Sequence, residues 1–468
     1  MRPRSLFEEP TAAARSLMTQ ETARSLADRV LGMVKADSTR VVISSDWSGN
    51  SRFAGGEITT SGEVSDNTVT VISTVGKRRA SSSTNILDDA AMRRTVDLSE
   101  RLARLSPEDP EIMPELGTQT YRPVNGYIER TADLGPEARA AAVTKVLQSA
   151  ATVGKPAGEV FVAGFLEANA RVNAIVNNKG LFAFHRSTDV SLSTTVRTPD
   201  ATGSGWASGG SRDWGALDAA ALGARAAQKA VASRNPQAIE PGMYTVVLEP
   251  QAVADLIPLL GGAFNARGAE EGRGPFSKRG GGTRLGEKIA DSRVTLYSDP
   301  WDAELLSQPF DAEGLPLQRR VWVENGVLKN LTYSRFWAQK QGAQPTGGAG
   351  GGFGGGGFPG GIKMVGGIKT TEQLIAETPR GILVTHFFYI RSLDQRTVLL
   401  TGLTRDGTFL IENGKVVRSL KNFRWNESPL FMLNKIAEIG RAERTSAGQI
   451  MPALRVKDFT FTSLSDAV

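Results

Sequence analysis

Apolar residues recur at helical spacing early in the chain, at Leu26, Val30, Leu31 and Val34, and predict a helix that begins near Met18. Residues 1–17 precede this pattern, and we expect them to form an N-terminal extension. Farther along, the period changes to that of β-strands. Runs at 40–43, 52–53 and 68–72 alternate with clusters of Ser, Gly and Asn, which favour turns, and together they predict a β-meander.

A loose internal repeat follows at an offset of 131 residues. The paired positions are Arg40-Val41 with Arg171-Val172, Gly49 with Gly180, and Phe53 with Phe184. A true repeat predicts two related sheet units, with helices at 135–151 and 213–235 packed on them. The second helix is rich in alanine, the residue with the strongest helix propensity, and should end near Asn235-Pro236.

The second half of the chain is richer in strand patterns. Pro241-Gly242 is the expected boundary, because the apolar strand 244–248 begins directly after it. We also predict a strand at 381–390, a hairpin turn at 412–415 and a final strand at 452–463. The expected fold class is α+β: a sheet with flanking helices at 18–239 and a β-rich domain at 240–468.

Residues 347–361 interrupt the β-rich half, since eleven of these fifteen residues are glycine. Glycine leaves the backbone so much conformational entropy that we expect a mobile loop. Phe353 and Phe358 lie within it and could contact a peptide. The tract lacks the Gly-Lys-Ser/Thr ending of a phosphate-binding loop, which argues against nucleotide binding.

The amino-acid composition disfavours two classes of function, nucleic-acid binding and membrane insertion. Hydrophobic residues at 40% and charged residues at 22% are ordinary for a globular protein, and the net charge of +6 is spread along the chain, so a nucleic-acid partner is disfavoured. No apolar run approaches the roughly 20 residues that span a bilayer, and the first residues lack the order of a secretory signal. We expect a cytoplasmic protein without a membrane partner.

Metal chemistry is restricted still further. The chain has no cysteine, which excludes thiolate ligands, and it has two histidines, His185 and His386. They lie 201 residues apart in strand-like sequence. His185 is expected to be an exposed or hydrogen-bonded strand residue. His386 precedes Tyr389 and Arg391 in an aromatic and basic segment, so these three residues are candidates for peptide contact, with a purely structural role as the alternative.

Several motifs, in order and spacing, resemble the TldD/PmbA family, whose members were once described as modulators of DNA gyrase. The motifs are Arg-Phe-Ala at 52–54, Leu-Gly-Glu-Lys at 285–288, Pro-Phe-Asp-Ala-Glu-Gly at 309–314, Val-Glu-Asn-Gly-Val-Leu at 323–328, Glu-Asn-Gly-Lys at 412–415 and Pro-Ala-Leu-Arg-Val at 452–456. Taken alone, the Asp-x-Glu-Gly and Asn-Gly segments indicate hairpin turns, because these residues tolerate positive φ.

The resemblance implies a zinc peptidase whose catalytic members carry His-Glu-x-x-x-His on a helix after the strand that opens the second half, with a late cysteine as third ligand. Neutral imidazoles would hold the metal, and the glutamate would take a proton from bound water. Here the segment after 244–248 has no histidine, and apolar residues around Leu256 and Ile257 appear at the ligand positions. We therefore expect no catalytic residues and no cofactor in this chain.

The resemblance further implies a non-catalytic subunit of the kind called PmbA or TldE. Such a subunit would pair with a zinc-bearing homologue, or with itself, to enclose unfolded peptides for cleavage. Two alternatives remain open from the residues: a hydrolase with its own unrecognised active site, and a stand-alone peptide-binding module. A serine hydrolase is disfavoured because no Gly-x-Ser-x-Gly turn precedes a suitable helix.

Overall fold

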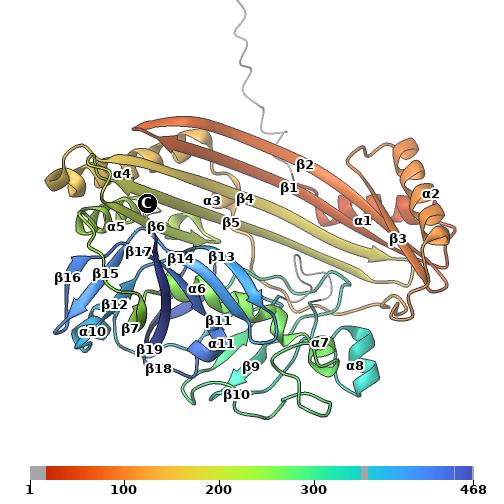
Figure 1. Ribbon diagram of the computed structural model, residues 1–468. Coiled ribbons are helices and arrows are strands. Elements are labelled where there is room, and N and C mark those ends of the chain that lie inside the picture. Colours follow the sequence, from red (N-terminus) through yellow and green to blue (C-terminus); the bar gives the residue numbers. More distant parts are fainter. Residues whose placement is uncertain (1–16, 349–356, 447, 466–468) are drawn as a thin grey trace, which may run out of the picture.

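The computed structural model describes residues 17–348, 357–446 and 448–465. Its first part is a six-stranded antiparallel sheet in the order β3-β2-β1-β4-β5-β6, drawn in red to yellow-green in Figure 1. The strands are β1 (Ser38–Ala54), β2 (Glu57–Val75), β3 (Arg78–Thr84), β4 (Phe161–Asn177), β5 (Phe182–Arg197) and β6 (Ser204–Ser211). The helices are α1 (Gln20–Leu31), α2 (Asp89–Leu105), α3 (Glu129–Ala132), α4 (Pro136–Gly154) and α5 (Ala219–Ala232).

This sheet contains an internal duplication. The order helix, three antiparallel strands, helix occurs as α1-β1-β2-β3-α2 and again as α4-β4-β5-β6-α5, and the two units join where β1 pairs with β4. The proposed offset of 131 residues is nevertheless wrong. It places Gly49, inside β1, against Gly180, which lies in the turn between β4 and β5. The repeat is one of topology, and the glycine match was a coincidence of composition.

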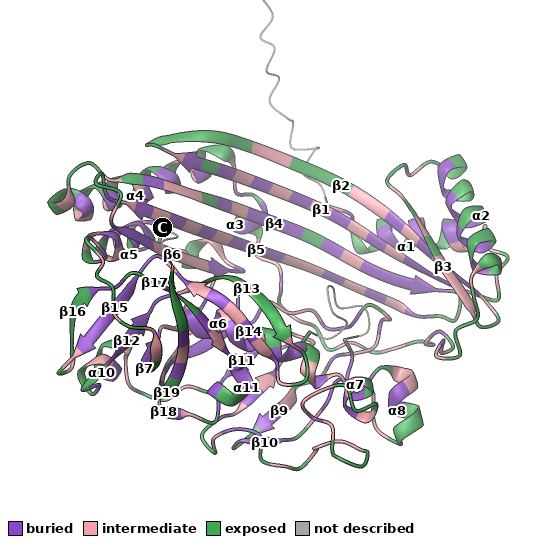
Figure 2. Cartoon of the chain, in the orientation of Figure 1, coloured by how far each residue is buried: buried purple, intermediate pink, exposed green. Residues whose placement is uncertain are grey.

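Both helix pairs cover the same face of the sheet. Alternate residues of β1, such as Val41, Ile43 and Trp47, point to this face, and Figure 2 shows the resulting alternation of buried and less buried positions along the strands. α1 and α2 cover one end, where Leu26 and Val30 join the core, and α4 and α5 cover the other. The opposite, inner face is left to meet the second domain.

The second domain is built on a larger mixed sheet, which has thirteen strands among the described residues. Its main path runs β10-β9-β8-β11-β19-β7-β12-β15-β16, and β13, β14, β17 and β18 attach beside it. The strands are β7 (Gly242–Leu248), β8 (Leu296–Ser298), β9 (Arg320–Glu324), β10 (Val327–Leu328), β11 (Lys363–Met364), β12 (Arg380–Val384), β13 (Phe387–Asp394), β14 (Leu399–Thr404), β15 (Thr408–Glu412), β16 (Lys415–Ser419), β17 (Asn422–Glu427), β18 (Ile436–Arg444) and β19 (Ile450–Ser465).

Short helices cover this sheet and close its core. They are α6 (Pro250–Leu256), α7 (Ala266–Glu270), α8 (Arg335–Gln341), α10 (Thr371–Ala376) and α11 (Pro429–Met432). The core is rich in aromatic rings, with Trp322, Phe423, Trp425 and Phe459 almost completely buried. No helix of the described ranges is long and apolar enough to cross a membrane.

Local signals in the sequence were the best guides to structure. Asn325-Gly326 and Asn413-Gly414 both take positive φ angles in the β9–β10 and β15–β16 hairpins, which confirms the predicted turns. The segments 40–43 and 52–53 are parts of one 17-residue strand, so their separation was wrong. The expected strand 381–390 is two strands, β12 and β13. The small and polar residues at 48–51 had looked like a turn, but they continue the strand, and their positions alternate between its two faces.

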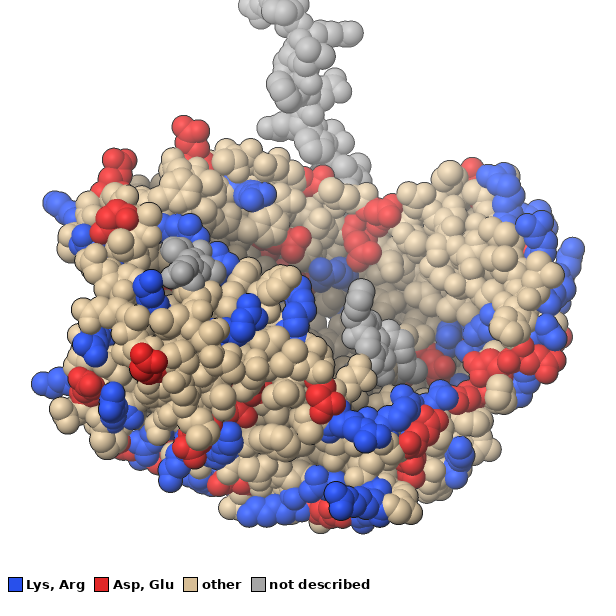
Figure 3. All heavy atoms as spheres, viewed as in Figure 1, with Lys and Arg blue, Asp and Glu red and all other residues tan. Residues whose placement is uncertain are grey.

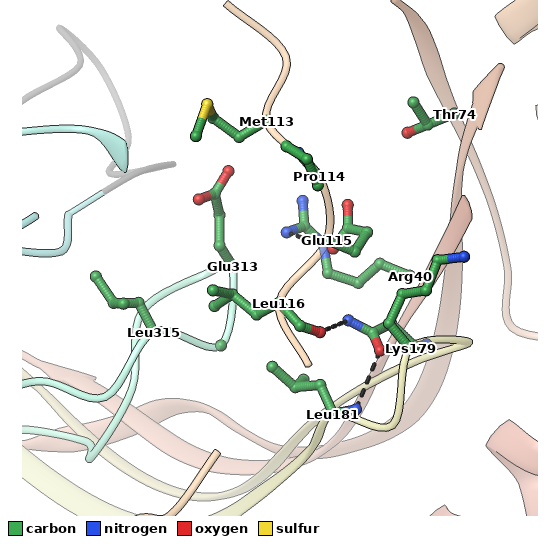
Figure 4. A network of polar contacts seen from close by, with 12 residues as sticks. Arg40, Thr74, Met113, Pro114, Glu115, Leu116, Lys179, Leu181, Glu313 and Leu315 are labelled. Carbon is green, nitrogen blue, oxygen red and sulfur yellow. Dashed lines mark hydrogen bonds and ion pairs between the residues drawn. The ribbon is translucent and has the colours of Figure 1, made fainter. Parts of the chain in front are cut away.

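The two domains meet through the connecting loop, residues 107–128, which runs between α2 and α3. Glu115 of this loop is buried between two strand arginines: its carboxylate accepts a hydrogen bond from Arg79 Nη2 at 3.1 Å and lies 3.4 Å from Arg40 Nη1. Figure 4 shows Glu115 beside Arg40, on the inner face of the sheet. The neighbouring Pro114 carbonyl accepts from Arg335 of the second domain at 2.6 Å. The loop therefore binds both domains at once.

A tight turn at 309–314 completes this junction. Phe310 is fully buried against Ile175 of β4 and Leu181, which directly precedes β5. Asp311 shapes the turn by accepting from the backbone N–H groups of Glu313 and Leu315, at 2.9 and 3.0 Å. Burial raises the pKa of Asp311 to about 6, although these two N–H groups favour the charged form.

We predict that Glu115→Gln lowers the free energy of unfolding by about 3 kcal/mol or more, because it leaves two arginines at the junction without their carboxylate. Glu108→Gln is the matched control, since Glu108 lies on the same loop and pairs with Arg78 at the surface. It should change stability by less than about 0.5 kcal/mol. Urea unfolding of the three proteins measures both values, and similar losses in the two variants would contradict the role given to burial.

The Asp311 carboxyl predicts a pH dependence of stability. Because its pKa is higher in the folded chain than the ordinary value of 3.8, the folded state holds an extra proton between about pH 4 and pH 6, and stability is lost as the pH rises through this window. The loss should reach about 3 kcal/mol. Asp311→Asn keeps the acceptor oxygen and should remove this dependence. Parallel unfolding profiles for the two proteins from pH 4 to 7 would refute the assignment.

Candidate functional site at the domain junction

Helix α6 follows β7 directly, and it carries a polar pair that the sequence analysis missed. Pro250 occupies the first turn, where a missing N–H costs nothing, and Gln251 and Asp255 lie four residues apart on one face. Gln251 Nε2 donates to Asp255 Oδ1 at 2.8 Å. Leu256 and Ile257, where we expected the substituted ligand positions, lie in the hydrophobic core instead. The side chains to consider are therefore Gln251 and Asp255.

Asp255 joins α6 to the start of β13. Its carboxylate accepts a hydrogen bond from the backbone N–H of Phe387 at 2.8 Å. Burial raises the pKa of Asp255, and the nearby imidazole of His386 acts in the opposite direction. The predicted site residue His386 thus has a carboxylate partner from a helix 131 residues away in sequence.

His386 also contacts the first domain. Its ring stacks on Trp206 of β6, with ring centroids 4.5 Å apart and the planes inclined by 18°. The side chain is 12% exposed, and Nδ1 lies 4.0 Å from Asp406 Oδ2. His386 is therefore held between the two domains, against an indole on one side and carboxylates of the second domain on the other.

A catalytic triad is not formed at this point. Ser204 lies close by, but its hydroxyl donates to Asp406 and not to the imidazole. A serine nucleophile would need the histidine as its base. The arrangement Ser204, Asp406, His386 therefore places the carboxylate between the other two groups, and it supports structure more readily than hydrolysis.

A cavity of about 720 Å³ opens beside the Trp206–His386 stack. The inner face of the first sheet supplies one wall, through Phe161, Thr195 and Arg197, and the second domain supplies Phe388 and Arg405. A smaller hollow of about 380 Å³ shares Asp406 with it. Figure 3 shows a separate hollow near the centre of the view, between the long strands and the second domain. Cavities of this size and mixed lining are typical of ligand sites.

Strand β13 leads away from the cavity. Among the described residues it pairs with β14 alone, so it forms an edge of the sheet. Tyr389 is 58% exposed and has a positive φ of 53°, at an irregularity in the pairing with β14. The Arg391 guanidinium lies over its ring, 4.2 Å from the centroid. The predicted contact residues Tyr389 and Arg391 thus lie together on an exposed edge, beside the cavity that His386 borders.

The other predicted residues do not join this group. Phe358 packs edge-on against Phe264, with ring centroids 5.0 Å apart, and against Trp322 at 5.6 Å. It is anchored in the core of the second domain, and only the remaining exposed part of the ring could meet a peptide. Phe353 lies outside the described residues.

His185 is buried in β5 at the junction. Burial lowers its pKa to about 4, the positive charge of Arg212 acts in the same direction, and a hydrogen bond with the backbone of Ser307 opposes both. It is therefore neutral at pH 7 and serves the packing of the two domains.

Comparison with known families matches most of the chain. The PmbA/TldA metallopeptidase central domain matches residues 128–234, and the PmbA/TldA metallopeptidase C-terminal domain matches residues 241–463. The chain belongs to the PmbA/TldD family. A metalloprotease of Methanothermobacter thermautotrophicus is 36% identical to it over 129 residues, which cover 27% of this chain and 27% of the relative. That alignment spans about a quarter of the relative's length.

Two further PmbA/TldD relatives match over longer stretches. The metalloprotease PmbA of Escherichia coli is 23% identical over 363 residues, which cover 72% of this chain and 73% of the relative. The crystal structure of TldE from Thermococcus kodakarensis superposes with a TM-score of 0.81 at 19% identity, over 94% of this chain and 99% of the other. These matches establish the PmbA/TldD fold and the kinship with metallopeptidases.

The site does not fit the zinc of catalytic PmbA/TldD members. Gln251 and Asp255 are half-buried on α6 and hydrogen-bonded to each other, and the sequence offers no cysteine. Within residues 17–348, 357–446 and 448–465, no three His, Cys, Asp or Glu side chains lie close enough to hold a metal ion. The donor set that zinc requires, three or four nitrogen, sulfur or carboxylate ligands, is not assembled there.

We predict that Asp255→Ala lowers the free energy of unfolding by about 1–3 kcal/mol, because the Phe387 N–H would stay buried without an acceptor. Asp255→Asn keeps an acceptor oxygen and removes a buried charge, so its loss should stay below about 1 kcal/mol. Urea unfolding at pH 7 distinguishes them. Equal losses would show that the negative charge beside His386, and not the acceptor, secures β13.

Proposed function

We propose that this chain is a non-catalytic subunit of a PmbA/TldD-type peptidase complex, which pairs with a zinc-bearing homologue and holds unfolded peptide at its domain junction. The observation that carries the proposal is the side-chain set on α6. A helix that would bear His-Glu-x-x-x-His in a catalytic member presents Gln251 and Asp255, hydrogen-bonded to each other and to β13. Because the polar groups of Gln251 and Asp255 take part in these structural hydrogen bonds, they are not directed at a metal.

The surface beside α6 suits an extended peptide. β13 offers an exposed edge, and backbone groups on such an edge pair readily with an added strand. Phe388, Tyr389 and Leu393 on this strand are all partly exposed, at 41%, 58% and 53%. Apolar side chains on an accessible edge strand are unfavourable in water when the chain is alone. Binding of a peptide or a partner subunit would remove them from water. The cytoplasm, where unfolded peptides are turned over, is the compartment we propose.

The assignment is tested by metal analysis and peptidase assays on this chain, on a zinc-bearing homologue and on their mixture. We predict far less than one zinc per purified chain and no hydrolysis of an unfolded peptide by the chain alone, because its donor set does not hold the metal. The mixture should form a stable complex and hydrolyse the peptide.

Each component of this assay has a distinct contrary result. Stoichiometric zinc that survives a weak chelator and is lost in His386→Ala would overturn the non-catalytic assignment. Metal-free hydrolysis by the chain alone would favour an independent hydrolase. Peptide binding without association with any such homologue would favour a stand-alone binding module.

A further inference from the structure

Aromatic rings from both domains line the cavity at their junction. Phe161 of β4 supplies a wall from the first domain, and Phe388 of β13 supplies one from the second. Both side chains are substantially exposed, at 51% and 41%. The Trp206–His386 stack adds a flat surface that is fixed between the domains. Exposed aromatic rings on several sides of one cavity can enclose a large apolar side chain.

The charged side chains of the cavity already have contacts within the protein. The Arg405 guanidinium lies over the Phe388 ring, 4.2 Å from its centroid, and its Nε lies 3.8 Å from Asp406 Oδ2. Asp406 also accepts a hydrogen bond from the Ser204 hydroxyl. Arg197 likewise has an interaction partner within the chain. A charged ligand would have to compete with these contacts, whereas a neutral apolar group leaves them in place.

Strand β13 relates this cavity to an extended peptide. Phe387 is buried in the core, where its ring stacks on that of Phe459, and the next residue, Phe388, points to the opposite face and lines the cavity. A peptide paired with the β13 edge would direct every second side chain to this face. The pairing with β14 is irregular between Phe388 and Arg391, where Tyr389 has its positive φ. Because such a bulge bends the strand and changes which side chains share a face, we expect one position of the peptide, beside Phe388, to reach the cavity.

We infer that this cavity is a subsite for one large apolar side chain, preferably aromatic, within an extended peptide that lies along β13. The side chain lies between Phe161 and Phe388 and packs against the Trp206–His386 stack. The inference rests on the proposed function, because it states which side chain of the bound peptide this subunit selects. The cavity volume of about 720 Å³ is within the range of roughly 300–1,000 Å³ that is typical of ligand sites, so one aromatic residue fits.

The test uses the full chain and unstructured peptides that differ at one central position, which is phenylalanine, serine or glutamate. Each peptide carries a neutral dye at its N-terminus and an amide at its C-terminus, so that terminal charges do not contribute. Fluorescence anisotropy should show that the phenylalanine peptide binds at least about tenfold more tightly than the serine peptide, because an aromatic ring is removed from water. The glutamate peptide should bind no more tightly than the serine peptide, since the charged groups of the cavity already have partners.

Phe161→Ala removes one wall of the cavity. It should reduce the ratio of the phenylalanine and serine affinities to within about threefold and leave binding of the serine peptide within about twofold. Phe431→Ala is the matched control, because Phe431 of α11 is similarly exposed, at 48%, and lies outside the cavity lining. It should retain the full ratio. Because the peptides are first compared on the unmodified chain, the test stands even where a variant folds poorly.

The outcomes separate this inference from the proposed function. Equal affinities of the phenylalanine and serine peptides for the unmodified chain would overturn the subsite, while peptide binding itself would stand. Tightest binding of the glutamate peptide would show selection by charge and would overturn it as well. A full ratio in Phe161→Ala would place the selected side chain elsewhere. If no peptide binds, either to the chain or to its complex with a zinc-bearing homologue, the peptide-holding role fails and the inference fails with it.

Discussion

The carboxylate of Glu115 lies 2% exposed at the meeting point of the two domains, held by Arg40 and Arg79 of the first sheet. Removing three charges from water is expensive, so the cluster gains little net stability over an apolar contact. Its consequence is geometric. The cluster fixes the connecting loop to the strands. The same loop accepts a hydrogen bond from Arg335 of the second domain through the Pro114 carbonyl. Its Tyr121 hydroxyl donates to the carbonyl of Gly314 at 2.7 Å. The distance and orientation between the two sheets follow from this contact.

The duplicated sheet determines where a ligand can bind. Both helix pairs pack on one face, so the inner face remains polar and faces the second domain. At the β5–β6 end, this face supplies Arg197 and Trp206, and the second domain supplies His386 and Phe388. Neither domain forms the cavity alone. A change in the junction at Glu115 should therefore alter the distance between the two walls of the cavity.

Features determined by a few neighbouring residues were predictable from the sequence. The Asn-Gly turns, helix α4 and the final strand belong to this class. Helix α2 was missed, although Asp88 caps its first turn and its buried positions recur at helical spacing. The long β1 was divided because the small and polar residues 48–51 interrupt its apolar pattern, and such a run resembles a turn.

The candidate site was only partly predictable for a similar reason. His386, Tyr389 and Arg391 could be suggested from their segment alone. Asp255, and Gln251 beside it, could be assigned a role only once the structure showed the hydrogen bond from β13 to Asp255. Trp206 could be placed at the site only once its ring was seen to stack on His386, 180 residues away in sequence. No periodicity or local motif contains those pairings. The absence of cysteine, by contrast, was evident from the sequence and restricts the metal chemistry without any structure.

The central claim is that this subunit holds peptide at its domain junction while a homologue supplies the metal. The most direct test is photo-cross-linking in the reconstituted complex, with an unfolded peptide that carries a photoreactive phenylalanine analogue. The account predicts cross-links to this chain at the walls of the cavity, near Phe161 and Phe388. Cross-links confined to the zinc-bearing subunit would contradict it.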